Sequence, residues 1–374
     1  MKVGVPTEIK TDEYRVSLTP AGVRELVDRG HDVYVQAGAG EGSAIADEAY
    51  ALQGATIVTT ARDVFDAADM VLGVKEPQPV EVEMLRPHHT LFTYLHLAPD
   101  PKLTAGLVES GATCVAYETV EDMAGKLPLL APMSEVAGKL AVQAGAYHLH
   151  RANGGRGTLL GGVPGVAAAN VMVLGGGVVG YNAANVAIGM GADVFVFDRN
   201  IDRLRELDVA FNGRASTVYS STLSIEEMLP RTDLVIGAVL VHGARAPHLV
   251  SREQLGLLPT RAVLVDVAID QGGCFETSRP TTHTEPTYEV DGIVHYCVAN
   301  MPGAVPVTST QALTNATLPY VIALAEHGVA AAVRRDRGLA LGVNVARGRV
   351  TLEPVATATG MPHTPLEEVL PDFI

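Results

Sequence analysis

The sequence predicts an α/β protein with two doubly wound domains, and three observations support this fold class. Short apolar strands rich in Val, Ala and Leu alternate with helical stretches along most of the chain. A glycine-rich turn joins a strand to a helix near the middle of the chain. The length of 374 residues exceeds what one hydrophobic core usually serves, so we expect two domains.

The first domain is expected to open with strands and helices in alternation. Strands are predicted at residues 2–5, 32–36, 56–59 and 70–74, with helices between them. One helix is predicted to begin after Thr19 and to end at Arg29. Its start is indicated by Thr19, a capping residue, and by Pro20 at the first helical position, where proline is favoured.

Two long helices are predicted at residues 132–150 and 310–327. We expect them to join the domains, with the C-terminal tail packing back on the first domain. The first domain is then discontinuous, made of residues 1–129 and 307–374, and residues 130–306 form the second. This arrangement would leave a cleft over the carboxyl ends of the sheet strands, where ligands of such folds bind.

A dinucleotide-binding turn is predicted at the start of the second sheet. The apolar strand 171–174 leads into Gly175-x-Gly177-x-x-Gly180, and a helix is expected at 182–190. The first glycine makes the tight turn, the second lets the backbone approach a pyrophosphate, and the third lets the helix lie close to the strand. The helix N-terminus offers unpaired N–H groups to the phosphates.

The acidic residue that such a site needs follows at the end of the next strand. Strand 193–197 leads to Asp198, 18 residues after Gly180, where a carboxylate can bind the ribose hydroxyls of NAD. Further strands complete the pattern of a Rossmann-like domain, at residues 217–219, 234–238, 262–266 and 293–298.

Composition excludes several classes of partner. The net charge of −15 argues against nucleic acid or an anionic membrane, because both require a positive surface. The cysteines, Cys114, Cys274 and Cys297, follow no metal-ligand spacing, so we expect reduced thiols and no metal site. The N-terminus resembles no signal peptide, and we expect no apolar run as long as a membrane span. The sequence therefore predicts a soluble cytoplasmic protein.

Three side chains of the first domain are candidates for chemistry. Arg15 follows the first strand, Lys75 is expected at a strand end, and His96 is expected inside a strand. Arginine suits a bidentate grip on a carboxylate, lysine a point charge near a carbonyl oxygen, and histidine proton transfer near neutral pH. Taken singly, each also fits a structural explanation: a surface charge, a lysine snorkelling from a strand end, or a hydrogen-bonded core histidine.

Two residues of the second domain also follow apolar strands. Asp270 lies before the glycines of Asp270-Gln271-Gly272-Gly273, and Asn300 follows the strand that ends near Val298. A helix or turn cap would also explain Asp270. Both residues are expected where this fold binds its ligand, which favours a functional role.

Several stretches together resemble the alanine dehydrogenase/pyridine nucleotide transhydrogenase family. The resemblance covers nearly the whole chain, and the Asp-Gln-Gly-Gly-Cys and Val-Ala-Asn-Met-Pro runs are its most specific motifs. It implies a reversible reaction in which L-alanine, NAD and water give pyruvate, ammonium and NADH, and it implies a homohexamer. The stretches that carry the resemblance are residues 10–20, 74–77, 94–97, 233–241, 265–280 and 296–302.

The resemblance also implies roles for individual residues. Arg15 and Lys75 would hold the substrate carboxylate and carbonyl oxygen. His96 would be the principal acid and base, and Asp270 would orient water or ammonium. Tyr94 and Asn300 would contribute to substrate binding. The cofactor would contact Met133, Ser134, Gly175, Gly177, Val178, Val179, Gly180, Asp198, Arg203, Ser220, Val239, Leu240, Ile269, Asp270, Val298, Asn300 and Met301.

Alternatives concern the cofactor and the reaction. Arg199 and Arg203 could accommodate a 2′-phosphate, but Asp198 would repel one, so the sequence predicts NAD rather than NADP. Related chemistry would be that of a soluble transhydrogenase-type subunit or of a saccharopine-type dehydrogenase. A non-catalytic NAD-binding protein is an alternative from another class.

Overall fold

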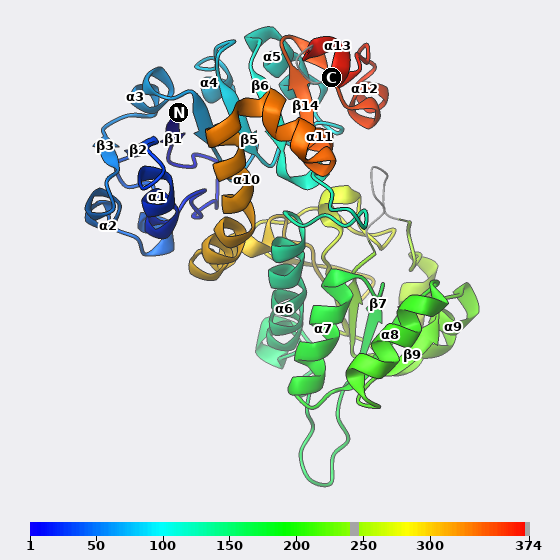
Figure 1. The fold of residues 1–374 in the computed structure, drawn as a ribbon. Coiled ribbons are helices and arrows are strands. Elements are labelled where there is room, and N and C mark those ends of the chain that lie inside the picture. Colours follow the sequence, from blue (N-terminus) through cyan, green and yellow to red (C-terminus); the bar gives the residue numbers. More distant parts are fainter. Residues whose placement is uncertain (240–246, 371–374) are drawn as a thin grey trace. The chain divides into compact units, whose positions relative to one another are not determined.

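A computed structural model describes residues 1–239 and 247–370, and the chain divides into two compact α/β units (Figure 1). Unit 1 comprises Met1–Met133 and the segment from Val305 onward, and unit 2 comprises Ser134–Ala304. The expected domain boundaries lie a few residues away, at 129/130 and 306/307. The division falls within α6 (Ala131–His148), whereas the chain returns to unit 1 just before its longest helix begins.

Unit 1 is built on an eight-stranded sheet with helices between its strands. Its strands are β1 (Lys2–Val5), β2 (Asp32–Gln36), β3 (Thr56–Val58), β4 (Met70–Leu72), β5 (Thr90–Thr93), β6 (Thr113–Ala116), β14 (Val343–Ala346) and β15 (Arg349–Val350). Its helices are α1 (Pro20–Val27), α2 (Asp47–Leu52), α3 (Ala61–Ala67), α4 (Pro79–Val82), α5 (Pro101–Ser110), α10 (Pro306–Arg335), α11 (Arg337–Gly342), α12 (Glu353–Thr359) and α13 (Leu366–Val369).

The order of strands in this sheet reverses direction between β1 and β4. The order is β15-β14-β6-β5-β4-β1-β2-β3, and the six strands from β1 to β6 are parallel. The chain winds from β1 to one edge and then from β4 toward the other. The loops after β1 and β4 therefore diverge at a topological switch point, which is where doubly wound sheets bind ligands.

The predicted local features of unit 1 are largely confirmed. Thr19 is the N-cap of α1, accepts from the backbone N–H of Gly22 through its side chain, and precedes proline at the first helical position. The hairpin of β14 and β15 was not predicted. Its tight turn at Arg347 and Gly348 has two successive positive φ angles of 48° and 76°. Such a turn matches the twist of antiparallel strands.

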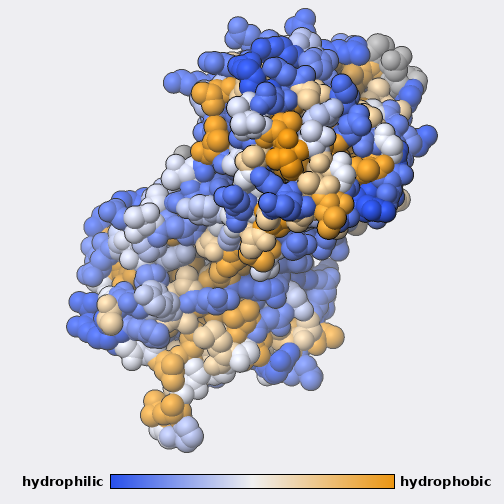
Figure 2. All heavy atoms as spheres, turned by 90° about the vertical axis from the view of Figure 1, so that its left-hand side faces the viewer, coloured by the Kyte–Doolittle hydropathy of each residue, from blue (hydrophilic) through white to orange (hydrophobic). Residues whose placement is uncertain are grey.

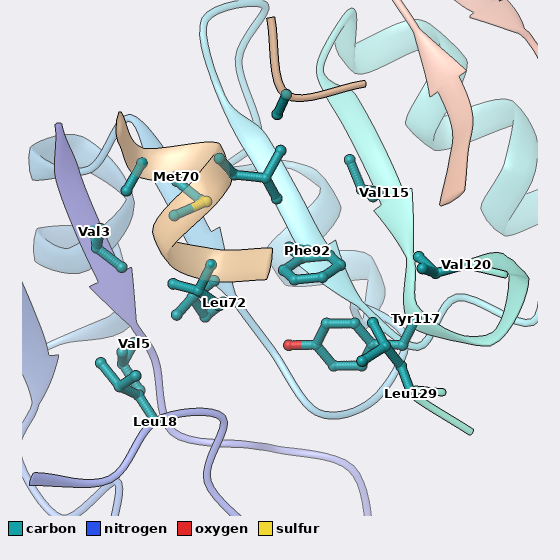
Figure 3. Close-up of a cluster of buried hydrophobic side chains, with 14 of the residues drawn as sticks. Val3, Val5, Leu18, Met70, Leu72, Phe92, Val115, Tyr117, Val120 and Leu129 are labelled. Carbon is teal, nitrogen blue, oxygen red and sulfur yellow. The ribbon is translucent and has the colours of Figure 1, made fainter. Parts of the chain in front are cut away.

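Apolar residues from β1, β4, β5 and β6 form one buried cluster in unit 1 (Figure 3). The Tyr117 ring packs edge-on against Phe92, with centroids 4.4 Å apart. Tyr117 is fully buried and directly follows β6. The core therefore extends to the carboxyl ends of these strands, where the loops carrying the candidate residues begin.

The long helix α10 corrects one expectation. Among the described residues, it is the one helix long and apolar enough to cross a membrane by length and composition, so the expectation that no apolar run reaches that length is wrong. Buried side chains such as Leu313, Val321 and Leu324 belong to the core of unit 1, and core helices of soluble proteins satisfy the same criterion. Backbone angles at Gly328, φ 70° and ψ 164°, interrupt the helix.

Unit 2 contains a seven-stranded sheet of the predicted kind. Its strands are β7 (Asn170–Leu174), β8 (Asp193–Asp198), β9 (Ser216–Tyr219), β10 (Leu234–Gly237), β11 (Val263–Asp266), β12 (Thr287–Val290) and β13 (Ile293–Tyr296). Its helices besides the shared α6 are α7 (Val178–Gly189), α8 (Ile201–Phe211) and α9 (Thr222–Met228).

The second sheet has the same doubly wound pattern as the first. Its order is β12-β13-β11-β10-β7-β8-β9, with every strand parallel except β12, an edge strand that was not predicted. The switch point lies between β7 and β10. The loop after β7 is the predicted glycine-rich turn, and α7 begins four residues earlier than the predicted helix at 182. The prediction of two Rossmann-like α/β units is confirmed.

Candidate active site

The charged residues of unit 1 gather in loops at one edge of its sheet. The carboxyl ends of parallel strands lie at the same edge, so the loops after β1, β4, β5 and β6 are neighbours. These loops carry the predicted residues Arg15, Lys75 and His96. The hydrogen bonds described below connect them to carboxylates that the sequence analysis did not single out.

Arg15 is a buried cation held by Glu13. Its Nε donates to Glu13 Oε1 at 2.6 Å, and its Nη2 donates to Glu13 Oε2 at 2.5 Å. Its Nη1 lies 2.9 Å from the sulfur of Met133. Burial by itself lowers the pKa of Arg15, but the hydrogen bonds and charge of Glu13 outweigh it, and the pKa is raised. At 3% exposure Arg15 is not a surface charge, which excludes the structural alternative for this residue.

Lys75 lies three residues beyond β4, in a loop that Glu8 holds. Glu8 accepts the backbone N–H groups of Val74 at 2.6 Å and Lys75 at 3.2 Å, one on each carboxylate oxygen. Thr93 donates its hydroxyl to the backbone oxygen of Lys75 at 2.8 Å. Burial raises the pKa of Glu8 to about 8, against the two backbone hydrogen bonds, which lower it. The backbone that presents Lys75 is therefore fixed from two neighbouring strands.

His96 does not lie inside a strand, which corrects the prediction. β5 ends at Thr93, and His96 has a left-handed backbone with φ 48°. Glu118 accepts the backbone N–H of His96 at 2.6 Å and that of Leu95 at 3.2 Å. These bonds to a side chain replace the sheet ladder here. The imidazole is 43% exposed, so His96 is not a buried core histidine.

Tyr94 lies beneath His96. The two rings are stacked, with centroids 5.8 Å apart and planes 5° apart. The hydroxyl of Tyr94 donates to the backbone oxygen of Leu129 at 2.6 Å, and burial raises its pKa. Tyr94 therefore supports the His96 ring and remains a neutral phenol in the core.

The glycine-rich loop of unit 2 forms the cradle that a dinucleotide requires. A Cβ on Gly180 would stand 1.8 Å from the backbone oxygen of Gly175, and a Cβ on Gly175 would stand 2.7 Å from the oxygen of Ala238. Gly175 also has φ 103°. Gly177 is the N-cap of α7, and no heavy atom lies within 4 Å of the position its Cβ would take. The open space before the N-terminus of α7 fits a pyrophosphate.

Asp198 is connected to this loop. Its Oδ2 accepts the backbone N–H of Gly176 at 2.7 Å, and its Oδ1 accepts that of Asn200 at 2.8 Å. Arg203 donates through Nε to the oxygen of Gly176 at 2.7 Å and through Nη1 to Glu206 at 2.6 Å. The acidic residue and the arginine are thus both anchored to the same turn.

Asp270 lies in a loop organised by a buried aspartate. It belongs to a short 3-10 helix, Ile269–Gln271, that begins three residues after β11, and its side chain is exposed. Asp266, at the end of β11, accepts the backbone N–H of Ala268 at 3.1 Å and that of Cys274 at 2.7 Å. The N-cap of the 3-10 helix is Ala268, so Asp270 does not cap it.

The remaining predicted residues occupy the following places. Asn300 has a left-handed backbone with φ 63°, and Met301 begins a 3-10 helix that runs to Ala304. Val239 lies beside Gly175. The backbone N–H of Ser220 donates to the oxygen of Asp198 at 2.9 Å. Ser134 lies on α6, Val178 and Val179 form the first turn of α7, Ile269 and Val298 are buried, and Leu240 lies outside the described residues.

Sequence reasoning missed four carboxylates: Glu8, Glu13, Glu118 and Asp266. Each lies at or shortly after the end of a strand and accepts backbone or guanidinium N–H groups of a loop with a candidate residue. Their position after strands could have indicated that they lie near the site. It does not indicate which N–H groups they bind. Within the described ranges, no cluster of three or more His, Cys, Asp or Glu side chains could hold a metal ion.

Comparisons with known proteins agree with this geometry. Residues 4–137 match the family model described as the N-terminal domain of alanine dehydrogenase/PNT, and residues 141–353 match its C-terminal domain. A curated alanine dehydrogenase of Halomonas elongata is 58% identical over 363 residues, covering 97% of this chain and 98% of that protein.

Solved structures extend the likeness. A structure of an L-alanine dehydrogenase is 51% identical, with a TM-score of 0.93 over 96% of this chain and 99% of the other. A transhydrogenase from Sinorhizobium meliloti is 25% identical, with a TM-score of 0.80 over 94% of this chain and 99% of the other. The glycine cradle of unit 2 fits the nicotinamide nucleotide that such enzymes use. The chain therefore belongs to the alanine dehydrogenase/pyridine nucleotide transhydrogenase family.

Proposed function

We propose that this chain catalyses the reversible, NAD-dependent oxidative deamination of L-alanine to pyruvate and ammonium. The observation that carries the proposal is the presence, in one chain, of a fixed guanidinium, a lysine and an exposed histidine at the carboxyl edge of one sheet, and of a dinucleotide cradle in the other. Full-length identity to curated alanine dehydrogenases supports the same substrate.

Arg15 and Lys75 would bind the substrate. Arg15 would bind the substrate carboxylate through its guanidinium, whose Nε and Nη2 donate to Glu13 and whose Nη1 lies beside the sulfur of Met133. Lys75 would stabilise the negative charge that develops on the substrate oxygen as the carbonyl forms or is attacked. Both side chains come from loops at the switch point of the sheet of unit 1.

His96 and Asp270 would move protons. Loss of hydride from Cα requires a neutral amine, and the resulting imine must then add water, so a base is needed for each step. His96 is exposed and would serve as the principal base, with Asp270 orienting the water or the ammonium. When bound, the nicotinamide accepts the hydride, and Asn300 would lie beside it.

We propose NAD rather than NADP as the cofactor. The carboxylate of Asp198 accepts a hydrogen bond from the glycine loop. There it would also accept hydrogen bonds from the ribose hydroxyls and would repel a 2′-phosphate. The guanidinium of Arg203 already donates to Gly176 and Glu206. The other residues predicted to contact the cofactor, from Met133 to Met301, would contact NAD as well.

We further propose that the protein is a cytoplasmic homohexamer. The loop that precedes β7 extends from unit 2 with Leu159, Val163 and Val166 each more than half exposed, and apolar atoms gather at the tip of a protruding loop (Figures 1 and 2). Exposed apolar side chains of this kind are typical of subunit contacts. Light scattering on the purified protein after size exclusion measures the mass: the mass of six chains supports the proposal, and any smaller mass contradicts it.

The test of the reaction is the loss of NADH absorbance with pyruvate and ammonium. Parallel samples contain NADPH in place of NADH, lack ammonium, or contain 2-oxoglutarate with lysine. Rapid oxidation of NADH that requires both pyruvate and ammonium supports the proposal. Oxidation only with 2-oxoglutarate and lysine indicates a saccharopine-type reaction. NADH binding without oxidation contradicts the proposal and leads to an assay of hydride exchange between nucleotides, then to a binding role.

A further inference from the structure

Glu118 contacts the backbone and approaches the ring of His96 at the same time. It lies in the 3-10 helix Tyr117–Thr119 that follows β6, and its side chain is 12% exposed. Its Oε1 accepts the backbone N–H of His96 at 2.6 Å, and both of its oxygens lie 3.2 Å from the backbone nitrogen of Leu95. One carboxylate thus binds two successive amides of the neighbouring loop.

These hydrogen bonds stabilise an unfavourable backbone conformation. His96 has φ 48°, in the left-handed region that costs a residue other than glycine about 1 kcal/mol. Hydrogen bonds between a carboxylate and amide N–H groups are stronger than neutral ones and can offset this cost. The direction in which the imidazole leaves the loop therefore depends on Glu118.

The same carboxylate also faces the imidazole. His96 Nδ1 lies 3.9 Å from Glu118 Oε1, close enough for charge interaction although too far for a hydrogen bond. Two titratable groups lie against this ring: Glu118, from the segment after β6, and Tyr94, from its own loop. The Tyr94 hydroxyl is buried and donates to Leu129, so Glu118 supplies the charge.

We propose that Glu118 is a positioning residue for His96, an inference that rests on the proposed function. Its amide contacts set the orientation of the ring. Its negative charge stabilises the protonated imidazole that forms when His96 accepts a proton from substrate amine or water. Removal of the charge should therefore affect proton transfer more than substrate binding.

The first test needs no turnover and uses diethyl pyrocarbonate, which modifies unprotonated imidazole. The rate of modification of His96 at pH 7 is followed by peptide mass spectrometry, since the chain has 12 histidines. In Glu118→Gln, we expect this rate to rise roughly 3-fold, because the imidazole loses the carboxylate near its Nδ1 and the amide contacts that hold its loop. In Glu118→Asp, which keeps the charge, the rate should stay close to that of the wild-type protein.

The second test measures pyruvate reduction by the same variants. We expect Glu118→Gln to lower kcat about 10-fold, with KM for pyruvate changed less than about 3-fold. Glu109→Gln is the matched control, since Glu109 is an exposed glutamate of α5 in the same unit. It should change neither the modification rate nor kcat.

The outcomes separate this proposal from the proposed reaction. If the wild-type protein does not reduce pyruvate but the modification rate still changes in Glu118→Gln, the reaction is wrong and the Glu118–His96 interaction stands. An unchanged modification rate in Glu118→Gln would overturn the positioning role even in an active enzyme. If Glu118→Gln loses its circular dichroism signal or NADH affinity, Glu118→Asp decides: a modification rate as in the wild-type protein supports the proposal, and a rate that rises as expected for Glu118→Gln overturns it.

Discussion

The two switch points of this molecule are built by different means. In unit 1, the loops after β1 and β4 are held by carboxylates: Glu13 on Arg15, and Glu8 on the amides of Val74 and Lys75. In unit 2, the loop after β7 is shaped by glycines, whose missing Cβ atoms allow close backbone contacts. The loops of unit 1 thus depend on carboxylate side chains, whereas the loop of unit 2 depends on glycines that have no side chain.

Because of this difference, we expect the two sites to be sensitive to different substitutions. Unit 1 should respond to the removal of a charged group, because its partner is then left buried without compensation. Unit 2 should respond to the addition of a single carbon, because backbone atoms that approach within 3 Å cannot move aside cheaply.

The largest effect is expected for His96→Ala. Loss of the acid and base should lower kcat for pyruvate reduction by about 10³-fold, while NADH affinity stays within about 2-fold. Steady-state kinetics and fluorescence titration with NADH measure the two quantities. Asp270→Asn should also lower kcat by about 10³-fold. Full turnover by either variant would remove that residue from the proton-transfer role.

Arg15→Ala should combine a binding effect with a stability effect. We expect KM for pyruvate to rise about 100-fold, and the free energy of unfolding to fall by about 3–5 kcal/mol because the buried carboxylate of Glu13 loses the guanidinium that balances its charge. The double variant Glu13→Ala/Arg15→Ala is the control. It should recover much of the stability, measured by urea unfolding, but not the pyruvate KM. A normal KM in Arg15→Ala would contradict the carboxylate role.

Two glycine variants sharpen the contrast in unit 2. Gly180→Ala places a Cβ 1.8 Å from the oxygen of Gly175, so we expect a loss of about 2–3 kcal/mol in the free energy of unfolding. Gly177→Ala enters open space and should keep the stability, but weaken NADH about 10-fold by blocking the approach of the pyrophosphate. Equal stabilities of the two variants would show that the contact at Gly180 relaxes.

The smallest effect concerns the pH dependence of stability at Glu8. Its pKa is raised from 4.5 to about 8, so the folded state binds more protons than the unfolded state between these values. Stability from this group is therefore present below pH 4.5 and is lost as pH rises to about 8. Relative to Glu8→Gln, the protein should lose a few degrees of thermal midpoint between pH 6 and pH 9. If the thermal midpoints of the two proteins change with pH in the same way, the pKa of Glu8 is not raised.

Much of the fold could be predicted because its signals are local. The cap of α1 at Thr19, the strand before Gly175 and the end of β8 at Asp198 each depend on a few neighbouring residues. The antiparallel additions, β12, β14 and β15, were missed because strands of two to four residues carry little periodic pattern. His96 was placed in a strand because the residues around it, from Thr93 to Ala98, are mostly apolar, but the strand ends at Thr93.

The position of the glycine cradle could be predicted from the sequence, because its three glycines and the start of α7 lie within a few residues of one another. How the charged residues of unit 1 are held became visible only in the folded protein. Glu8 binds the amide of Lys75 across 67 positions of sequence, and Glu118 binds that of His96 across 22. The physical reason is the parallel sheet, which brings the carboxyl ends of strands together whatever the length of chain between them.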